Sequence, residues 1–318
     1  MTALLEVRDL KVRFKSPTGP VTAVDGISFS IGKGRTLGLV GESGCGKSVT
    51  SLALMGLTTG AVEGSIRFED RELIGLSQRA LASVRGDRMA MIFQEPMTSL
   101  NPVYRVGDQI IEAIRAHRSV GTAEARALAI EALKRVRLPA PERRVDDFPH
   151  QLSGGMRQRV MIAMALVCTP ALLIADEPTT ALDVTIQAQI LDLMRGLSAD
   201  SGTAILMITH DLGVVAELCE DVVVMYAGRV VEQAPVAALF DDPQHPYTLG
   251  LLGAIPRLED DKERLATLPG RVPPPQAMPV GCRFNPRCPF AIDQCKREAP
   301  PLVEYAPGHQ VACWRAPL

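Results

Sequence analysis

The residues Gly41-Glu42-Ser43-Gly44-Cys45-Gly46-Lys47-Ser48 fill every fixed position of the pattern G-x-x-x-x-G-K-[ST]. The apolar run Thr36-Leu37-Gly38-Leu39-Val40 precedes them and predicts a buried strand, whereas Val49 to Leu57 has the composition of a helix. A glycine-rich loop between a strand and a helix N-terminus can wrap a phosphate, because backbone N–H groups and the helix dipole face the anion. We therefore expect Lys47 to reach the β- and γ-phosphates of a nucleotide and the Ser48 hydroxyl to ligate Mg²⁺.

The composition narrows the class of protein. The length of 318 residues predicts about two domains. Of these residues 47% are hydrophobic but only 4% are aromatic, which is typical of an aliphatic α/β interior. The net charge of −2 argues against nucleic acid as a partner. Met1 to Glu6 include an acidic residue and begin no long apolar region, which is not the pattern of a secretory signal. No run reaches the ~18 apolar residues of a membrane span. We therefore expect a cytoplasmic protein whose role at a membrane would come through a partner.

Two pairs of strands are predicted around the loop. Alternating apolar and polar residues at Leu5–Phe14 and Val24–Ile31 predict antiparallel strands, joined through a turn at residues 16–20. A second pair of strands is predicted at Gly64–Phe68 and Met89–Phe93. The loop would thus connect to an antiparallel β subdomain.

A helical block follows these strands. Between Val106 and Arg137 the periodicity is helical with a turn at Ser119–Thr122, which predicts a helical subdomain inserted between strands. Further on, Ser153 is a good N-cap for a helix that runs to about Cys168, and the two glycines after it leave the first N–H groups open to an anion. Taken alone, such a start is more often a simple cap than a phosphate site.

Three predicted strands end in residues that can serve a nucleotide. Gln94 ends one strand, Asp176 and Glu177 follow the continuous apolar run Ala171–Ala175, and His210 ends a third. Two carboxylates at a buried strand end need partners. Mg²⁺ and a reacting water would supply them, so that Asp176 would hold the metal and Glu177 would polarise the water. Because ligands bind beyond the carboxyl ends of strands in α/β sheets, we expect one shared site.

The remaining patterned segments complete an alternation of helices and strands. They predict, in order, a helix, a buried strand, a short helix and a hairpin: Ile186–Leu197, Thr203–Thr209, Val214–Cys219, and Val222–Tyr226 with Gly228–Glu232. Three cysteines stand alone inside patterned segments and are expected to be small core or loop residues: Cys45, Cys168 and Cys219.

In order and spacing, these motifs resemble the nucleotide-binding subunits of ATP-binding cassette (ABC) transporters over essentially the whole chain. The resemblance implies an α/β P-loop NTPase fold of ABC type with an antiparallel β subdomain. It also implies a nucleotide-binding domain at residues 1–240, a helical subdomain at about 96–165 within it, and a small Cys-rich C-terminal extension at 241–318.

The resemblance also assigns roles to single residues. Glu177 and His210 would be catalytic, with His210 contacting the γ-phosphate, and Phe14 would stack on the adenine. The Mg²⁺ ligands would be Ser48, Gln94 and Asp176. The ATP-binding residues would be Phe14, Gly41, Ser43, Gly44, Cys45, Gly46, Lys47, Ser48, Val49 and Gln94.

The same family explains a Ser-Gly-Gly helix start far from the phosphate loop. Two such subunits would dimerise head to tail, so that Ser153, Gly154 and Gly155 of one subunit contact the ATP on the other. The family's D-loop would lie beside this contact and corresponds to Ala181–Asp183. Met156 departs from the family's general signature, which ends in Gln, but it lies beyond the phosphate-contacting residues.

Three stretches narrow the resemblance to the ATPases of bacterial dipeptide/oligopeptide importers. They are Phe93-Gln94-Glu95-Pro96-Met97-Thr98-Ser99-Leu100-Asn101-Pro102, Gly154-Gly155-Met156-Arg157-Gln158-Arg159, and His245-Pro246-Tyr247 with the Cys-rich tail. This implies an ATPase peripheral to the cytoplasmic face of the membrane. Its partners would be a second, different ATPase, two transmembrane permeases and an extracellular peptide-binding protein, and the segment after Gln94 would transmit motion to the permeases.

Three other functions stay open at this point. Nickel importer ATPases are the nearest competitor, although they generally lack so long a tail. Soluble cassette ATPases of DNA repair or translation generally carry two cassettes or long coiled-coil insertions. An inactive regulatory subunit is the third, and the presence of Glu177 and His210 counts against it.

The tail contains four cysteines, Cys282, Cys288, Cys295 and Cys313, spaced C-x5-C-x6-C-x17-C after a Pro-rich stretch. A cytosolic location argues against disulfides, and four thiolates in a small segment suggest Zn²⁺ or an iron–sulfur cluster. The spacing matches neither the bacterial ferredoxin run nor the usual zinc knuckles, so unligated thiols also stay possible. The resemblance to the importer group favours a [4Fe–4S] cluster over Zn²⁺.

Overall fold

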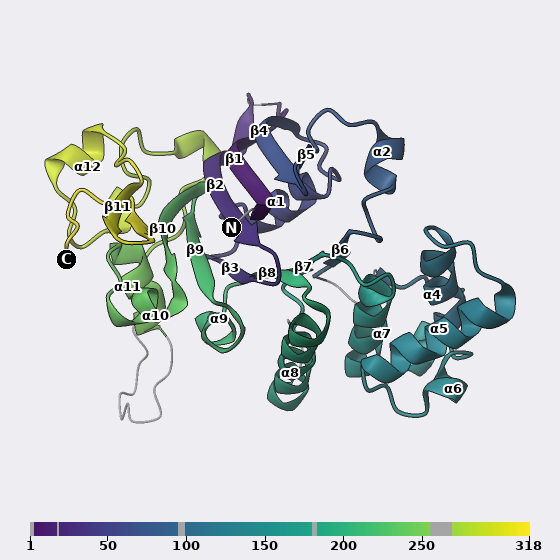
Figure 1. Cartoon of the computed structure of the whole chain (residues 1–318). Coiled ribbons are helices and arrows are strands. Elements are labelled where there is room, and N and C mark those ends of the chain that lie inside the picture. Colours follow the sequence, from purple (N-terminus) through teal and green to yellow (C-terminus); the bar gives the residue numbers. More distant parts are fainter. Residues whose placement is uncertain (1–2, 18, 95–98, 180–182, 255–268) are drawn as a thin grey trace. The chain divides into compact units, whose positions relative to one another are not determined.

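A computed structural model of the chain describes residues 3–17, 19–94, 99–179, 183–254 and 269–318 (Figure 1). The chain divides into two compact units. The first unit is formed by residues 1–32, 36–75 and 207–318, and the second by residues 33–35 and 76–206.

The first unit contains a four-stranded antiparallel sheet with the order β2-β1-β4-β5. Its strands are β1 (Ala3–Phe14), β2 (Val21–Gly32), β4 (Ala61–Phe68) and β5 (Arg71–Glu72). The predicted antiparallel pairing of the first two strands is confirmed, with Val12 opposite Val24. Alternate residues of β1 such as Leu5 and Val7 are buried, because successive side chains of a strand point to opposite faces.

The predicted pairing of Gly64–Phe68 with Met89–Phe93 is wrong. β4 pairs instead with β1 and β5, while β6 (Met89–Ile92) lies parallel to β7 (Leu172–Asp176) in the second unit. A hairpin between β4 and β5 forms because Glu69 and Asp70 both take left-handed backbone angles, with φ of 48° and 63°. This local turn gives β4 a neighbour that the apolar pattern alone did not reveal.

The first unit also holds five neighbouring strands in the order β11-β12-β10-β9-β3. They are β3 (Thr36–Val40), β9 (Asp221–Tyr226), β10 (Arg229–Pro235), β11 (Val303–Ala306) and β12 (His309–Val311). β3 has the predicted bounds, and the predicted hairpin is confirmed as the antiparallel pair β9–β10. The last two strands come from the C-terminal region and pair with β10 through β12, as the yellow arrows of Figure 1 show.

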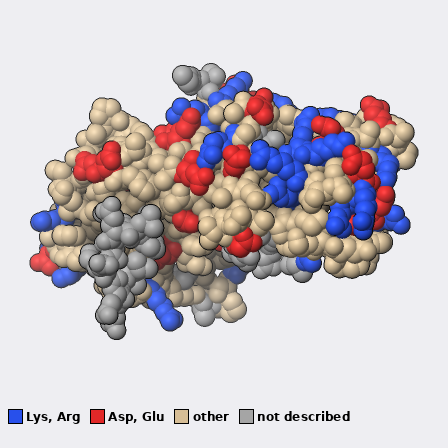
Figure 2. All heavy atoms as spheres, turned by 90° about the horizontal axis from the view of Figure 1, so that it is seen from below, with Lys and Arg blue, Asp and Glu red and all other residues tan. Residues whose placement is uncertain are grey.

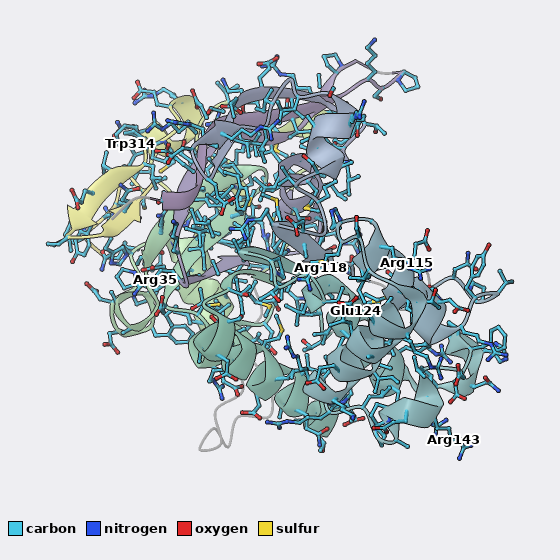
Figure 3. All side chains as sticks on the ribbon, turned by 45° about the vertical axis from the view of Figure 1, so that its right-hand side comes forward. Arg35, Arg115, Arg118, Glu124, Arg143 and Trp314 are labelled. Carbon is cyan, nitrogen blue, oxygen red and sulfur yellow. The ribbon has the colours of Figure 1, made fainter. Side chains whose placement is uncertain are left out.

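Among the described residues of the first unit, four helices accompany the helix that follows the phosphate loop. They are α9 (Leu212–Leu218), α10 (Val236–Asp241), α11 (Pro246–Gly253) and α12 (Asp293–Arg297), with 3-10 turns η2 (Pro275–Ala277) and η3 (Asn285–Arg287). Near the C-terminus, the indole N–H of Trp314, labelled in Figure 3, donates to the Glu298 carbonyl at 3.1 Å.

A buried carboxylate ties the C-terminal region to β10. Glu232 is fully buried and accepts hydrogen bonds from the backbone N–H groups of Gln244 at 2.6 Å and His245 at 3.0 Å. Its Oε1 also lies 2.8 Å from Nε2 of His309 on β12. A buried carboxylate is tolerated only when its oxygens are satisfied in this way. The C-terminal strands are therefore attached to the sheet by both backbone and side-chain hydrogen bonds.

The second unit combines the β6–β7 pair with a group of helices. These are α2 (Gln78–Ala82), α4 (Val106–Arg115), α5 (Thr122–Arg135), α6 (Pro141–Arg144), η1 (Pro149–Gln151), α7 (Gly154–Leu166) and α8 (Val184–Ser201). The predicted helical block is confirmed: α4, α5 and α7 pack together around the buried Ile110, Ile114 and Leu133. α8 extends beyond the predicted end at Leu197 because Gly202, with φ of 66°, supplies the left-handed C-cap.

Charged side chains cover the outer faces of these helices. Figure 2 shows Lys and Arg side chains gathered over α4, α5 and α6, with Asp and Glu among them. Arg115, Glu124 and Arg143 project from the same helices in Figure 3. Arg115 donates to the Thr122 hydroxyl at 2.8 Å and so joins the end of α4 to the start of α5. Within the described residues, no helix is long and apolar enough to cross a membrane.

Candidate nucleotide-binding site

The predicted phosphate loop connects β3 to α1 (Lys47–Leu54), as the sequence pattern requires. Gly41 has φ of 150°, and a Cβ there would lie 2.2 Å from the Met225 carbonyl oxygen. Gly46 has φ of 107° and caps α1, and a Cβ there would lie 2.7 Å from the Ala23 carbonyl oxygen. Only glycine fits these two positions, because both the backbone angle and the neighbouring backbone exclude a side chain. The loop is therefore held tightly against its surroundings.

Lys47 is buried and is held by the loop itself. Its Nζ donates to the Gly41 carbonyl at 2.6 Å and to the Glu42 carbonyl at 3.1 Å, and it lies 3.8 Å from Sγ of Cys45. Burial raises the pKa of the Cys45 thiol, so this side chain is a neutral neighbour at physiological pH. The ammonium group thus satisfies its donors with carbonyl oxygens of the same loop that is expected to receive phosphates.

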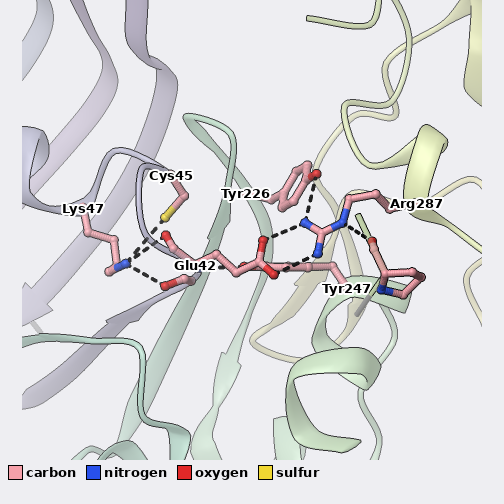
Figure 4. A network of polar contacts seen from close by, with 8 residues as sticks. Glu42, Cys45, Lys47, Tyr226, Tyr247 and Arg287 are labelled. Carbon is pink, nitrogen blue, oxygen red and sulfur yellow. Dashed lines mark hydrogen bonds and ion pairs between the residues drawn. The ribbon is translucent and has the colours of Figure 1, made fainter. Parts of the chain in front are cut away.

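Glu42 is fixed on two sides by residues far away in the sequence (Figure 4). Its backbone N–H donates to the hydroxyl of Tyr247 at 2.7 Å. Its carboxylate accepts two hydrogen bonds from the guanidinium of Arg287, at 2.6 Å and 2.9 Å. No sequence pattern pointed to Glu42 or Arg287, because the motif leaves the second loop position open.

The other predicted residues of the first unit lie at strand ends. Phe14 is the last residue of β1 and is partly exposed beside Gly60, where a Cβ would lie 3.1 Å from its ring. His210 follows β8 (Ala204–Thr209) and is exposed. The next residue, Asp211, caps α9 by accepting from the Gly213 N–H at 2.8 Å. His210 is therefore presented by a fixed strand-to-helix turn.

In the second unit, Gln94 and Glu177 are in direct contact. The parallel pairing of β6 with β7 places Ile92 opposite Ala175, so both strands end at the same edge. The amide Nε2 of Gln94 donates to Oε2 of Glu177 at 3.0 Å. The expectation that these two residues share a site thus agrees with the geometry of this unit. Asp176, the last residue of β7, is 3% exposed.

Glu177 has an unusual backbone conformation. Its φ is 46°, which is uncommon for a residue other than glycine and costs of order 1 kcal/mol. The carbonyl of the next residue, Pro178, accepts a hydrogen bond of 2.6 Å from Nε2 of Gln158 on α7. The turn after β7 is therefore held in place by the helix that begins at the Ser-Gly-Gly sequence.

The Ser-Gly-Gly sequence begins α7 with an exposed tip. Ser153 is the N-cap, and its hydroxyl accepts from the Met156 N–H at 3.4 Å. A Cβ on Gly154 would meet nothing within 4 Å, whereas one on Gly155 would lie 3.1 Å from the Ile186 side chain. Below the tip, Nε of Arg157 donates to the carbonyls of Pro149 and Leu152 at 2.9 Å and 3.0 Å. The expected cap is present, and the sequence analysis did not predict the supporting contacts of Arg157 and Gln158.

Some predicted residues lie outside the described part of the chain. These are Ala181 and Leu182 of the D-loop and the stretch Glu95–Thr98 after Gln94. Asp183 is described, and its Oδ1 accepts from the Ile186 N–H at 2.9 Å, so it caps α8. Of the predicted Mg²⁺ ligands, Ser48 belongs to the first unit and Gln94 and Asp176 to the second.

The four C-terminal cysteines lie in one part of the first unit. Burial, together with the neighbouring thiols of Cys295, Cys288 and Cys313, raises the pKa of Cys282 to about 11. The backbone N–H of Cys282 also donates to the Cys295 carbonyl at 2.8 Å. Among the described residues, no three His, Cys, Asp or Glu side chains are arranged to hold a metal ion. The donor set suits soft metals, but its side chains are not arranged as a ligand shell.

Comparison with known families gives two matches. A family model described as ABC transporter matches residues 24–180. A second, described as oligopeptide/dipeptide transporter, C-terminal region, matches residues 231–295.

Known proteins resemble the chain along nearly its whole length. A probable peptide ABC transporter ATP-binding protein, y4tR of Sinorhizobium fredii, is 54% identical, covering 98% of this chain and 95% of that protein. The oligopeptide transport ATP-binding protein OppD of Salmonella typhimurium is 52% identical, covering 98% and 93%. The dipeptide transport ATP-binding protein DppD of Escherichia coli is also 52% identical, covering 98% and 96%.

Solved structures resemble most of the chain as well. A dimeric ATP-binding cassette in a post-hydrolysis state, bound to ADP and Pi, aligns with a TM-score of 0.67 at 27% identity, covering 73% of this chain and 98% of that one. The protein cbiO1 of Clostridium perfringens, part of an ABC transporter complex, aligns with a TM-score of 0.64 at 28% identity, covering 76% and 92%.

Proposed function

Because this chain belongs to the ABC transporter ATP-binding proteins of the oligopeptide/dipeptide group, we propose that it hydrolyses ATP to import peptides through membrane permeases. The predicted family and the P-loop NTPase fold of ABC type are confirmed, and the chain is an ATPase of this family. The relatives are named for peptide, dipeptide and oligopeptide transport, which favours peptides over nickel and over a role in DNA repair or translation.

The phosphates of ATP would bind at the loop Gly41–Ser48. Lys47 would exchange its bonds to the carbonyls of Gly41 and Glu42 for bonds to phosphate oxygens, which are stronger charge-assisted acceptors. The N-terminus of α1 is capped by a glycine, so its first N–H groups can point at an anion. Phe14 would contact the adenine ring. The other loop and helix residues proposed in ATP binding are Ser43, Gly44, Cys45, Gly46, Ser48 and Val49.

Hydrolysis would use residues at the ends of β6, β7 and β8. Gln94 donates to Glu177 through Nε2, so its Oε1 is the atom that can serve as a metal ligand. Ser48, Gln94 and Asp176 offer the oxygen donors that Mg²⁺ prefers, and the ion, when bound, neutralises phosphate charge. Glu177 would accept the proton of the attacking water, with Gln94 orienting its carboxylate, and His210 would contact the γ-phosphate.

A complete site would need a second ATPase subunit. Ser153 and Gly154 are exposed at the tip, a Cβ on Gly154 would meet nothing within 4 Å, and a helix N-terminus rich in glycine suits a phosphate. We place it on ATP bound by the neighbouring subunit, with Asp183 beside that interface. A different ATPase chain is the neighbour we favour. Two permeases and an extracellular peptide-binding protein would complete a transporter in which this subunit lies on the cytoplasmic face of the membrane.

The C-terminal region would form a second functional domain. We propose domain bounds of 1–240 and 241–318, with a helical subdomain at about 96–165. Cys282, Cys288, Cys295 and Cys313 would bind a [4Fe–4S] cluster, with Zn²⁺ as the alternative, and this would require their side chains to rearrange. Protein purified without air should then be brown and contain acid-labile sulfide. A colourless, iron-free preparation with stoichiometric zinc would contradict the cluster.

Reconstitution tests the main proposal. The chain with its partner ATPase, permeases and binding protein is placed in vesicles, and ATP-driven uptake of labelled peptides is compared with uptake of Ni²⁺. We expect peptide uptake that is lost in Glu177→Gln while ATP binding is retained. Uptake of Ni²⁺ instead of peptides, or full uptake by Glu177→Gln, would contradict the proposal.

A further inference from the structure

Arg287 in the C-terminal region is buried against the phosphate loop of its own unit (Figure 4). Only 4% of its side chain is exposed. Its guanidinium forms a two-pronged ion pair with Glu42, through Nη1–Oε2 at 2.6 Å and Nη2–Oε1 at 2.9 Å. This fork-to-fork geometry fixes orientation as well as distance, and lysine cannot reproduce it.

The surroundings of Arg287 allow it little freedom. Its Nε donates to the Pro269 carbonyl at 2.8 Å, and its guanidinium carbon lies 5.7 Å and 5.8 Å from the ring centres of Tyr226 and Phe284. A buried guanidinium that lost its carboxylate would be an uncompensated charge, which is strongly unfavourable. Arg287 and Glu42 therefore keep their positions together or move together.

Glu42, whose carboxylate is fixed by Arg287, also contacts Lys47 through its backbone. Its backbone N–H is held by the hydroxyl of Tyr247 at 2.7 Å, and its carbonyl accepts from Nζ of Lys47 at 3.1 Å. The position of one residue, Glu42, is thus set from the C-terminal side at both its carboxylate and its amide. The same residue helps to set the position of the phosphate-binding ammonium group.

We propose that Arg287 is a positioning residue of the ATP site, which couples the conformation of the C-terminal cysteine segment to the affinity of the phosphate loop for ATP. Arg287 ends η3 and directly precedes Cys288, so a rearrangement of this segment moves the guanidinium and, through the ion pair, moves Glu42 with it. By thermodynamic linkage, ATP on the loop in turn stabilises the segment. The inference rests on the proposed ATP site at Gly41–Ser48.

A double-mutant cycle on the full-length chain tests the coupling. The dissociation constant of ATP is measured for wild type, Arg287→Gln, Glu42→Gln and the double variant. We expect each single change to weaken ATP binding about tenfold, and the double variant to be no weaker than either, because both remove one interaction. The control Lys296→Gln removes an exposed ion pair of the same region, Lys296–Asp293 at 3.1 Å, and should leave affinity unchanged.

Hydrogen exchange provides a readout that a purely structural role would not change. ATP should slow amide exchange at residues 282–288 in wild type. It should leave this exchange unchanged in Glu42→Gln, a substitution that changes no residue of the C-terminal region. If Arg287→Gln fails to fold, Glu42→Gln and the exchange measurement still decide the matter. Additive effects in the cycle, or equal ATP protection in Glu42→Gln, would overturn the inference. Wild type that binds no ATP would instead overturn the proposed function.

Discussion

Two glycine-rich helix starts of this molecule are built in opposite ways. The phosphate loop before α1 is enclosed: Gly41 and Gly46 touch neighbouring backbone, and Lys47 is buried. The tip of α7 is open, since Ser153 and Gly154 are exposed and a Cβ on Gly154 would meet nothing within 4 Å. The supports of α7, such as Arg157, lie below the tip instead of around it.

The difference indicates whether each helix start is enclosed by its own unit or left exposed to a partner. An enclosed loop with a buried cation is organised by its own unit to receive an anion. An exposed glycine tip has no such enclosure, yet Ser153 caps it and Arg157 holds the turn beneath it. Such a tip is suited to a surface that closes over it only in an assembly, which is the arrangement proposed for the ATP-bound pair of subunits.

The largest effect should come from adding charge to the open tip. Gly154→Glu is expected to fold normally, because the position is unobstructed, but to lower ATP turnover about 100-fold by repelling the γ-phosphate on the neighbouring subunit. ATP binding to the isolated chain should not change. Steady-state turnover of the complex and ATP affinity of the single chain are the two measurements.

Gly121→Glu is the matched control for that variant. Gly121 is the N-cap of α5 and also has nothing within 4 Å of a Cβ, but it carries no phosphate role. Its turnover should equal that of wild type. Normal turnover in Gly154→Glu would mean that the tip does not approach ATP.

A stability effect should separate the enclosed loop from the open tip. Gly41→Ala places a Cβ 2.2 Å from the Met225 carbonyl at φ of 150° and should lower the free energy of unfolding by about 2 to 3 kcal/mol. Gly154→Ala should change it by less than about 0.5 kcal/mol. Urea unfolding measures both. Equal effects would show that the two loops are not packed differently.

The smallest effect concerns pH and the support of the enclosed loop by α11. Burial lowers the pKa of His245 to about 3, and its Nδ1 accepts from the Tyr247 N–H at 3.0 Å, which requires a neutral ring. The unfolded chain, with a histidine pKa of about 6.5, binds the extra proton first as pH falls. Stability from His245 is therefore complete above pH ~6.5 and is lost towards pH ~3.

Between pH 7 and pH 5.5 this loss should reach about 1 kcal/mol. His245→Asn keeps an acceptor for the Tyr247 N–H without titrating, so its unfolding free energy should fall less over the same interval. Urea titrations at the two pH values compare the variants. An identical pH dependence in His245→Asn would show that this histidine is not the group responsible.

The parts of the fold that the sequence predicted correctly are those specified locally. β3 has the predicted bounds because the short, mainly apolar run Thr36–Val40 directly precedes the glycine-rich loop. Gln94 and Glu177 were expected in one site because ligands bind beyond the carboxyl ends of strands, and the structure has a contact between them, although the β6–β7 pairing that makes it was not predicted. That His210 lies in the same site as Gln94 and Glu177 stays a prediction.

The parts that were not predicted depend on contacts between distant segments. β12 has only three residues, too few for a periodic signal, and it is placed by pairing with β10 and by the buried Glu232. Arg287 was not singled out because its role depends on Glu42, a position that the loop motif leaves open. No local pattern of charge or hydropathy encodes such a pair.

The central claim is that ATP is bound between the enclosed loop of one subunit and the open tip of another. The most direct measurement is a structure of the complex trapped with Mg²⁺ and ATP in the Glu177→Gln variant. We predict that Ser153, Gly154 and Gly155 contact the γ-phosphate of ATP held by the partner ATPase. A trapped, ATP-loaded complex in which this tip faces solvent would contradict the account.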